Sequence, residues 1–268
     1  MKRLSFLLPL VACNQVFGLE ETTLDPGSGS PRCPAVGAGA PSFTMPPKII
    51  EGTAGCTSYN FDTNRTYVVA QCGDRVMSGP LDGPLTMPVR FETAIAFQTP
   101  RIAPDGRRLF VRRRQLAYYF SELERGVDDV WFNEVSEPQA TTSTEGISTP
   151  ASLFPPRILV LQQDGVIVEV ERDADTYTWA YVANYTASEL GASTLADPYL
   201  SPDGKRMLFV DGARVMYLDR ERLSDPFPGP AREVSIRGAP PSVTTPFLLP
   251  DCERLYFSTG EGVAYVDP

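Results

Sequence analysis

Short apolar runs alternate with clusters of Gly, Pro, Asp, Asn and Ser along most of this chain. The apolar runs are rich in Val, Ile, Tyr and Phe, which is typical of β-strands, and no stretch sustains the spacing of an amphipathic helix. The pattern therefore predicts an all-β body. The single helix candidate is a short segment, residues 120–125.

One phrase occurs three times, beginning at Pro100, Pro198 and Pro246, and each copy carries Pro-Asp followed by Gly or Cys. In such a turn the proline fixes φ, the carboxylate accepts backbone N–H groups and the glycine allows φ above zero. Recurrence at equivalent positions indicates a structural role for these side chains. The turn residues are Pro104, Asp105, Gly106, Pro202, Asp203, Gly204, Pro250 and Asp251.

The spacing of the copies defines the repeat. The step from Pro198 to Pro246 is 48 residues, and the step from Pro100 to Pro198 is about twice as long, so a further copy is expected near position 149. A copy that lacks the Asp-Gly turn begins there, at Pro150. One more step back places another unit within residues 57–97.

Each unit has room for several short strands. After Pro202 they are expected at residues 206–210 and 214–218 and near 232–236. Four short strands in about 40 to 50 residues are typical of a β-propeller blade, so we predict about five four-stranded blades, or six if the strands are short. The last unit ends after two strands that follow its turn. Residues 47–51, or strands within 57–97, must therefore complete it.

The repeated phrase resembles the PD40 propeller repeat, whose signature reads roughly P-x-x-S-P-D-G-K-x-L-x-F. Residues 197–218 match it closely, residues 99–111 nearly as well, and residues 245–258 match it with Cys252 in place of the glycine. The resemblance implies a TolB-like propeller over about two thirds of the chain that follows residue 12. It does not extend to the small α/β domain that precedes the propeller in TolB, so it implies none of the partners of TolB.

The N-terminus carries an export signal: a basic start, an apolar run from Leu4 to Val11, and the tetrad Leu-Val-Ala-Cys13. The tetrad resembles a bacterial lipobox, which implies cleavage before Cys13 and a lipid on its sulfur. Asn14 then implies the outer membrane. The alternatives are an ordinary signal peptide or a buried N-terminal strand, and the apolar run is too short to span a bilayer.

These readings divide the chain into a signal peptide at 1–12, a flexible tether at 13–47 and a propeller at 48–268. The tether is assigned because residues 19–47 are rich in Gly, Pro, Ser and Ala and show little apolar periodicity.

Composition excludes several classes of function. The net charge of −9 becomes −11 when Lys2 and Arg3 are removed, which argues against a nucleic-acid partner. The chain has no histidine, so Ser-His-Asp and Cys-His catalysis and imidazole metal ligands are absent. No C-x-x-C spacing occurs either. We therefore expect no metal and no cofactor.

Four cysteines remain once Cys13 is assigned to lipid, and an even number in an oxidising compartment suggests two disulfides. Three pairings can be drawn. We favour Cys56 with Cys72, because the loop between them is short and they flank a predicted strand. Cys33 and Cys252 would then link the N-terminal segment to the last repeat. Free buried thiols are the alternative.

Carboxylate pairs and aromatic side chains are the remaining candidates for chemistry. The pair Asp173 and Asp175 is read as a hairpin turn in preference to a calcium site. The basic run 112–114 should alternate between the two faces of a strand, so it does not form one patch. The other candidates are the carboxylate pairs Glu20-Glu21 and Asp128-Asp129, the aromatics Tyr118, Tyr119, Trp131, Trp179 and Tyr181, and the glycosylation sequons at Asn64 and Asn184.

The sequence favours a monomeric, non-enzymatic, lipid-anchored propeller on the periplasmic or outer surface of a bacterial envelope, where its loops bind a protein or a glycan. One alternative is a propeller glycosidase or lyase that uses carboxylates and tyrosines in a central funnel. Another is a purely structural envelope protein. Asp, Glu, Arg and Tyr converging in a deep central pocket would favour the enzyme, whereas an aliphatic plug there would argue against it.

Overall fold

The computed structural model describes most of the chain beyond its N-terminal segment. The chain divides after Pro31, and all described residues belong to the second unit. None of them forms a helix that could cross a membrane. The described residues are 33–91, 97–114, 118–126, 130–132, 144–148, 157–162, 164–173 and 178–268.

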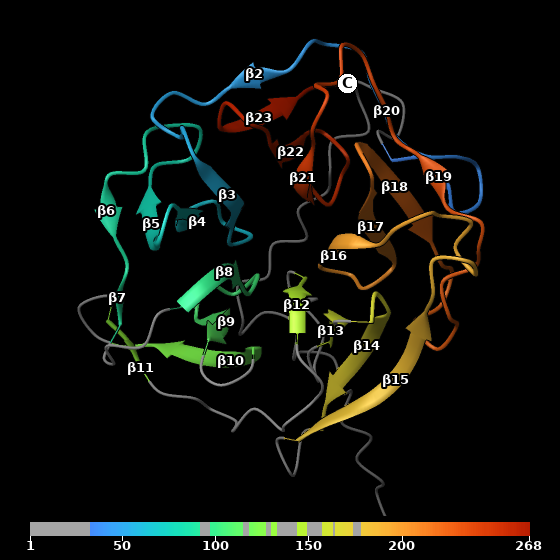
Figure 1. Ribbon diagram of the computed structural model, residues 1–268, viewed down its shortest axis with the longest axis horizontal. Coiled ribbons are helices and arrows are strands. Elements are labelled where there is room, and N and C mark those ends of the chain that lie inside the picture. The colour runs from blue at the N-terminus through green and yellow to red at the C-terminus, as the bar shows by residue number, and fades with distance from the viewer. Residues whose placement is uncertain are drawn as a thin grey trace, which may run out of the picture. The chain divides into compact units, whose positions relative to one another are not determined.

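Five small sheets stand around a common centre as the blades of a five-bladed β-propeller (Figure 1). The expected all-β fold and its five blades are confirmed. Within each blade successive strands pair antiparallel, and the first strand lies innermost. The first strand of each blade contacts the first strand of the next all around the ring, so the inner strands enclose the axis.

The blades follow one another along the chain. Blade 1 contains β3 (Cys56–Phe61), β4 (Val68–Cys72), β5 (Arg75–Gly79) and β6 (Met87–Pro88). Blade 2 contains β8 (Phe97–Ile102), β9 (Arg108–Arg114), β10 (Tyr118–Arg125), β11 (Val130–Phe132) and β7 (Arg90–Phe91). Blade 3 contains β12 (Thr144–Ile147), β13 (Arg157–Gln162), β14 (Ile167–Arg172) and β15 (Trp179–Tyr185).

Blade 4 contains β16 (Ala196–Leu200), β17 (Arg206–Asp211), β18 (Arg214–Asp219) and β19 (Arg232–Glu233). Blade 5 contains β21 (Thr244–Leu248), β22 (Leu255–Ser258), β23 (Val263–Val266) and, from the N-terminal side of the chain, β2 (Lys48–Ile49). A separate parallel pair joins β1 (Ser42–Phe43) to β20 (Ser235–Ile236).

The hydrophobic core lies between neighbouring blades. Successive side chains of a strand point to opposite faces of its sheet, so each second strand packs against both neighbours. In β9, Leu109 and Val111 pack with residues of blade 1, whereas Phe110 packs with residues of blade 3. This explains why each second strand contains a continuous apolar run, such as Leu109–Val111, instead of alternating apolar and polar residues.

The repeated turns have the geometry that their sequence predicts. Each turn aspartate accepts a hydrogen bond from the backbone N–H two residues later, for Asp105 at 2.9 Å and for Asp203 at 3.1 Å. Gly106 has a φ of 68°, and Cys252 has the left-handed φ of 57° at the equivalent place in the third copy. Its disulfide to Cys33 therefore stands at a turn position that glycine occupies elsewhere.

The ring is closed by the N-terminal side of the chain. β2 pairs antiparallel with β23, so residues 47–51 complete blade 5, one of the two alternatives that the sequence left open. Both disulfides have the expected pairing: Cys33 bonds to Cys252, and Cys56 bonds to Cys72, its partner across β3 and β4.

Residues 33–47 are not a tether, in contrast to the sequence-based boundary at 47. They carry Cys33, which is held by its disulfide, and Phe43, which is 1% exposed, and β1 pairs with β20. The Gly- and Pro-rich composition concealed this packing because few apolar residues anchor it. The preceding part of the expected tether, 13–32, lies outside the described residues.

Two further expectations were wrong in detail, and a third is tested only in part. Residues 120–125 form part of β10 and not a helix, because pairing with β9 outweighs the local helix propensity. Blade 2 has five strands instead of four, since β7 adds in parallel to β11. The third concerns the repeat copy that was expected to begin at Pro150. The strand expected after it is present as β13, whereas the inner strand of blade 3, β12, ends at Ile147, before Pro150. Pro150 itself lies outside the described residues.

Candidate functional site

Two of the blade interfaces contain a buried arginine–glutamate pair. Arg172 at the end of β14 donates to both carboxylate oxygens of Glu122 in β10 of the preceding blade, each at 2.7 Å. Arg220, which follows β18, donates to Glu169 in β14 from Nη1 and Nη2, one to each carboxylate oxygen, at 2.9 and 2.7 Å. Both glutamate side chains are fully buried. The pairs therefore join blade 2 to blade 3 and blade 3 to blade 4.

The two pairs occupy equivalent positions in their blades. Glu122 lies opposite Phe110, the third residue of β9, and Glu169 lies opposite Leu159, the third residue of β13. Each arginine follows the last acidic residue of its third strand, as in Glu171-Arg172. The same acidic-arginine ending occurs in blade 2, where Arg125 is the last residue of β10.

Blade 1 has serine where blades 2 and 3 have glutamate. The turn that follows the first strand shows which residues of blades 1 and 2 correspond. In blade 1, the N–H of Asp62 donates to the carbonyl of Tyr67, and in blade 2 the N–H of Ala103 donates to the carbonyl of Arg108. Tyr67 therefore occupies the position in blade 1 that Arg108 occupies in blade 2. Two residues after these positions come Val69 in β4 and Phe110 in β9. Val69 pairs with Ser78 on the third strand of blade 1, and Phe110 pairs with Glu122 on the third strand of blade 2. The interface between blades 1 and 2 therefore has Arg125 on one side and Ser78 on the other.

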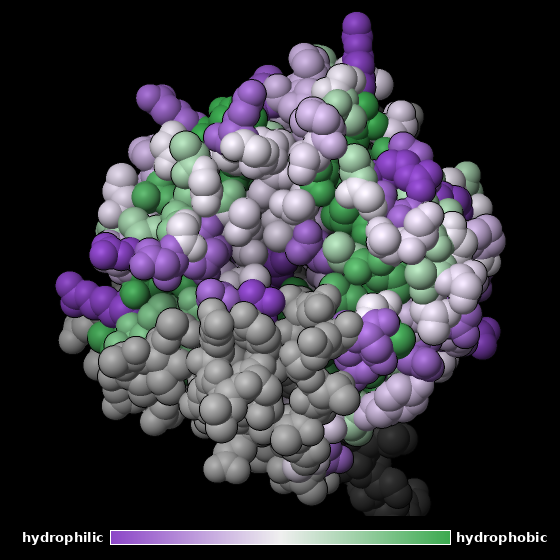
Figure 2. Space-filling model, in the orientation of Figure 1, coloured by the Kyte–Doolittle hydropathy of each residue, from purple (hydrophilic) through white to green (hydrophobic). Residues whose placement is uncertain are grey.

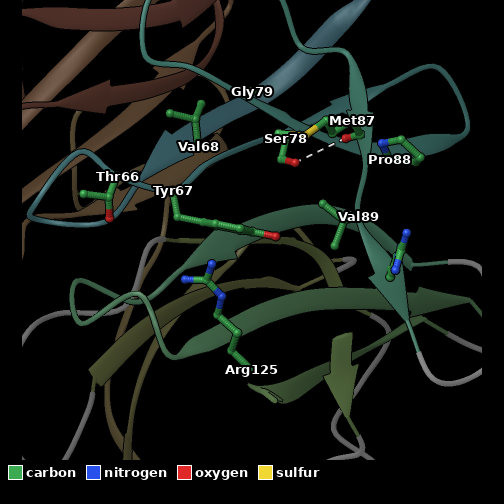
Figure 3. A pocket seen from close by; sticks show the side chains of 10 residues that line it. Thr66, Tyr67, Val68, Ser78, Gly79, Met87, Pro88, Val89 and Arg125 are labelled. Atoms are coloured by element: carbon green, nitrogen blue, oxygen red, sulfur yellow. Dashed lines mark hydrogen bonds between the residues drawn. The ribbon is translucent and has the colours of Figure 1, made fainter. Parts of the chain in front are cut away.

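A cavity of about 510 Å³ lies at this interface (Figure 3). Figure 3 shows Arg125 on one side of the Tyr67 ring and Ser78 on the other side of the opening. The guanidinium of Arg125 lies over the Tyr67 ring at 4.1 Å from its centroid, and Trp131 Nε1 donates to the Tyr67 hydroxyl at 3.1 Å. The lining residues are Thr66, Tyr67, Val68, Ser78, Gly79, Met87, Pro88, Val89, Arg90 and Arg125.

The charge of this cavity is positive. Among the described residues, its lining contains two guanidinium groups, those of Arg90 and Arg125, and no carboxylate. The apolar part is contributed mainly by Met87 and Val89 beside the ring of Tyr67. A volume of a few hundred Å³ with apolar walls and a few polar groups is the usual character of a small-molecule site. We therefore regard it as the candidate binding site.

A second cavity, of about 400 Å³, lies between blades 5 and 1, and its charges are paired. Arg254 donates to Asp82 at 2.6 Å and to Asp267 at 2.7 Å, and Glu253 lies 3.7 Å from Arg65. Burial opposes the charged form of Arg254, but the hydrogen bonds that it donates to Tyr256 and Asp267 raise its pKa above the usual value. This cluster holds the closing blades together.

A third, smaller cavity of about 200 Å³ lies where the turns after several inner strands meet. Its lining is mostly proline, phenylalanine and leucine. The carboxylate of Asp62 accepts the N–H groups of Thr66 and Tyr67, and that of Asp251 accepts the N–H of Glu253. These carboxylates therefore stabilise turns, and no catalytic cluster converges here among the described residues.

The inner wall of the ring carries polar groups that the sequence did not single out. Arg101 of β8 is 4% exposed, and its Nε donates to the carbonyl of Ile147 at 3.1 Å. Burial lowers the pKa of Arg101 to about 10, against the opposing effect of Asp197, so it stays protonated at neutral pH. The hydroxyls of Ser58 and Thr99 are buried without a hydrogen-bond partner in the described part of the chain. Figure 2 shows hydrophilic residues in the middle of the ring.

The sequence-based candidates do not gather into one site. Trp131 is buried, Trp179 packs on Phe110 at a centroid distance of 6.0 Å, and Tyr181 is 64% exposed. Arg112 donates to Gln98 within its own blade. Within the described ranges no group of acidic or cysteine side chains could hold a metal. Asp173, Asn64 and Asn184 are exposed.

Several candidates fall where nothing can be said of their side chains. Glu20, Glu21, Asp128, Asp129 and Asp175 lie outside the described residues, as does the predicted lipid site, Cys13.

The residues that line the cavity between blades 1 and 2 were not predicted. One signal was present in the sequence: an acidic residue followed by arginine ends the third strand in three units, as Glu124-Arg125, Glu171-Arg172 and Asp219-Arg220.

Comparison with known proteins supports the fold and nothing finer. No protein-family model and no curated protein matches the chain. A protein of unknown function from Desulfotomaculum acetoxidans is similar in structure, with 13% identity and a TM-score of 0.50 over 79% of this chain and 68% of its own. An identity this low indicates a shared propeller fold alone.

Two further solved structures are similar at lower scores. A protein assigned as TolB from Agrobacterium tumefaciens has 13% identity and a TM-score of 0.47 over 75% of this chain and 69% of its own. A protein assigned as a 6-phosphogluconolactonase from Bacteroides uniformis has 14% identity and a TM-score of 0.45 over 75% of this chain and 62% of its own. The similarity to these two proteins is distant, and the β-propeller fold is shown by the strand arrangement of the chain itself.

Proposed function

We propose that this protein is a lipid-anchored envelope propeller that binds a glycan or protein partner without transforming it. The cavity between blades 1 and 2 carries this proposal: it measures about 510 Å³, and its described lining includes Tyr67, Arg90 and Arg125. Such a lining suits recognition of a ligand. Within the described ranges the lining offers no carboxylate as acid, base or nucleophile, and so no pair of the kind that glycoside hydrolysis requires.

The anchor follows from the N-terminal sequence. Cleavage before Cys13 would leave the lipid on the first residue of the mature chain, and residues 14–32 would connect it to Cys33. Cys33 is bonded to Cys252 in the turn between β21 and β22. The connecting segment would therefore be about 20 residues long and not the 35 that the sequence boundary implied. Outer-membrane placement follows from Asn14.

Membrane fractionation tests the anchor. The substitution Cys13→Ala should move the protein from the membrane fraction to the soluble fraction, because each buried acyl methylene contributes about 0.8 kcal/mol to membrane binding. The parent protein should stay with the membranes after a high-salt wash and leave them with detergent. Retention of Cys13→Ala on washed membranes would refute lipidation.

Capture from the native envelope tests the binding role. The intact lipoprotein should retain a glycan or protein partner, and Tyr67→Ala should lose it, because the ring supports one wall of the cavity. Tyr181→Ala, a change at an exposed tyrosine of blade 3, is the matched control. Equal capture by both variants would place binding elsewhere. A captured glycan that is shortened on incubation would instead favour the enzyme.

A further inference from the structure

The outermost strand of blade 3 is unlike those of the other blades. β15 has seven residues, whereas β6, β7, β19 and β2, which lie outermost in the other four blades, have two residues each. Each of these short strands also contains a proline or a charged residue, namely Pro88, Arg90, Arg232 with Glu233, and Lys48. β15 contains neither kind, and it lies at the rim of the ring (Figure 1).

This difference matters because the outer edge of a sheet presents unpaired N–H and C=O groups to any other strand that approaches it. Proteins protect such edges with short strands, prolines and charged side chains, and four of the five blades follow this rule. β15 does not, and its middle is exposed to solvent: Tyr181 is 64% exposed and Val182 is 36% exposed. No strand within the described ranges pairs with its outer edge. The edge is therefore open to strand pairing.

The charges around β15 favour a second copy of this chain as the partner. Residues 176–188 contain no charged side chain, in a protein of which 21% of the residues are charged. A two-fold axis sets each residue near the same residue of the other copy, so a charged strand would bring like charges together. A neutral strand avoids this repulsion. We propose that two copies form a dimer by antiparallel pairing of β15 with β15. The dimer does not depend on the proposed binding function, and it departs from the monomer that the sequence favoured.

The register of the dimer follows from the bulge in β15. Val182 has no partner residue in β14, and three paired residues stand on either side of it, 179–181 and 183–185. A bulge disrupts the ladder where it occurs, so a two-fold axis at Val182 leaves both flanking segments regular. Residues 179–181 of one copy then face residues 183–185 of the other. In this register Tyr181 lies opposite the smaller Ala183, and a large side chain facing a small one favours close packing.

The size of the contact sets its strength. A stable protein interface uses about 20 to 30 residues on each side, whereas β15 supplies seven. The dimer is therefore weak and reversible, and we expect it to form in the micromolar range of concentration. Its detection requires a method that follows mass as a function of concentration.

Sedimentation equilibrium of the purified protein tests the dimer. All samples carry Cys13→Ala, so that no lipid contributes to association. The average mass should rise from one copy towards two between roughly 1 and 500 µM. Amide hydrogen exchange in residues 180–185 should become slower over the same range, because pairing protects the backbone N–H groups of the edge. A protein that stays monomeric would overturn the proposal and leave the edge to an extended segment of another protein. A rise in mass without slower exchange in β15 would also refute it.

Charge substitutions at Val182 locate the contact. Val182→Lys and Val182→Glu should each weaken the dimer at least roughly tenfold, because like charges then face each other across the axis. An equimolar mixture of the two variants should dimerise again, since opposite charges meet. Ile49→Lys, at a 44% exposed residue of the outermost strand of blade 5, is the control and should dimerise like the parent. Circular dichroism would verify that each variant is folded. Undiminished dimerisation of Val182→Lys, or a mixture that stays monomeric, would refute the pairing.

Discussion

The interface between blades 1 and 2 and the interface between blades 2 and 3 are built from equivalent strands, yet one contains a cavity and the other a buried ion pair. Arg172 meets the fully buried Glu122, whereas Arg125 lies over Tyr67 and faces a cavity bordered by Ser78. One replacement on the third strand of a blade thus accompanies the change from a filled interface to an open one.

The difference has an energetic basis. Removing two charges from water costs several kcal/mol per ion, and their attraction offsets this cost only in good geometry. The Arg172–Glu122 pair has that geometry, with both oxygens at 2.7 Å. At the equivalent place of the interface between blades 1 and 2, Ser78 brings no buried charge that must be compensated.

The largest predicted effect comes from breaking the filled interface. Arg172→Ala leaves the buried carboxylate of Glu122 with a 3.5 Å contact to Arg108 as its remaining ion pair within the described ranges. The substitution should therefore lower the free energy of unfolding by about 3 to 5 kcal/mol. Urea denaturation followed by fluorescence would measure it. Arg222→Ala, at an exposed arginine, is the control. A loss below about 1 kcal/mol would show that the pair is not needed to hold the blades together.

A smaller effect should appear at alkaline pH, at the interface between blades 3 and 4. Tyr185 donates to Glu169 at 2.9 Å, and burial together with the adjacent carboxylate raises its pKa above the unfolded value near 10. Above pH 10 the hydroxyl of Tyr185 loses its proton in the unfolded state before it does so in the folded state. The contribution of the Tyr185–Glu169 hydrogen bond to the free energy of unfolding is therefore complete below pH 10 and declines as the pH rises. One such proton corresponds to about 1.4 kcal/mol per pH unit.

Tyr185→Phe should therefore be less stable than the parent at pH 8, and the difference should narrow between pH 10 and 11. Denaturation midpoints over this range would measure the trend. Tyr181→Phe, at an exposed tyrosine, should run parallel to the parent. A constant difference for Tyr185→Phe would contradict the linkage to Glu169.

The smallest predicted effect is at the open interface. Arg125→Ala leaves the neutral Ser78 in place of a buried carboxylate, and the stacking on Tyr67 is worth about 0.5 to 1 kcal/mol at a partly exposed site. The same denaturation measurement should therefore show a smaller loss than for Arg172→Ala, because the residue opposite is Ser78 and not a fully buried carboxylate. A loss equal to that of Arg172→Ala would mean that the two interfaces are energetically alike.

Much of the fold could be predicted because it depends on local chemistry. The Pro-Asp-Gly turns marked three of the five blades, and the expected pairing of Cys33 with Cys252 followed from counting cysteines and from the length of the other loop. The helix predicted at 120–125 was wrong because short segments have weak intrinsic preferences that strand pairing outweighs. The tether boundary was wrong because few buried residues, such as Phe43, hold residues 33–47.

The candidate site was harder to predict, because its members come from different strands. Tyr67 and Ser78 belong to blade 1 and Arg125 to blade 2, and none has an unusual local context. Arg101 likewise stands where two other copies have Tyr199 and Phe247, a difference that becomes informative only when the inner strand is seen to face the middle of the ring.

The sequence by itself determined the repeat and its turns, since these depend on residues close in the chain, and it favoured the cysteine pairing without determining it. Only the tertiary structure decided which charges meet. Packing between blades brings Arg172 to Glu122 and Arg125 to Ser78, residues of different blades. The energy of a charge depends on what lies within a few ångströms of it. The cavity between blades 1 and 2 is therefore a property of the folded ring. In the sequence, the difference from the next two blades is a serine, Ser78, at the position of Glu122 and Glu169.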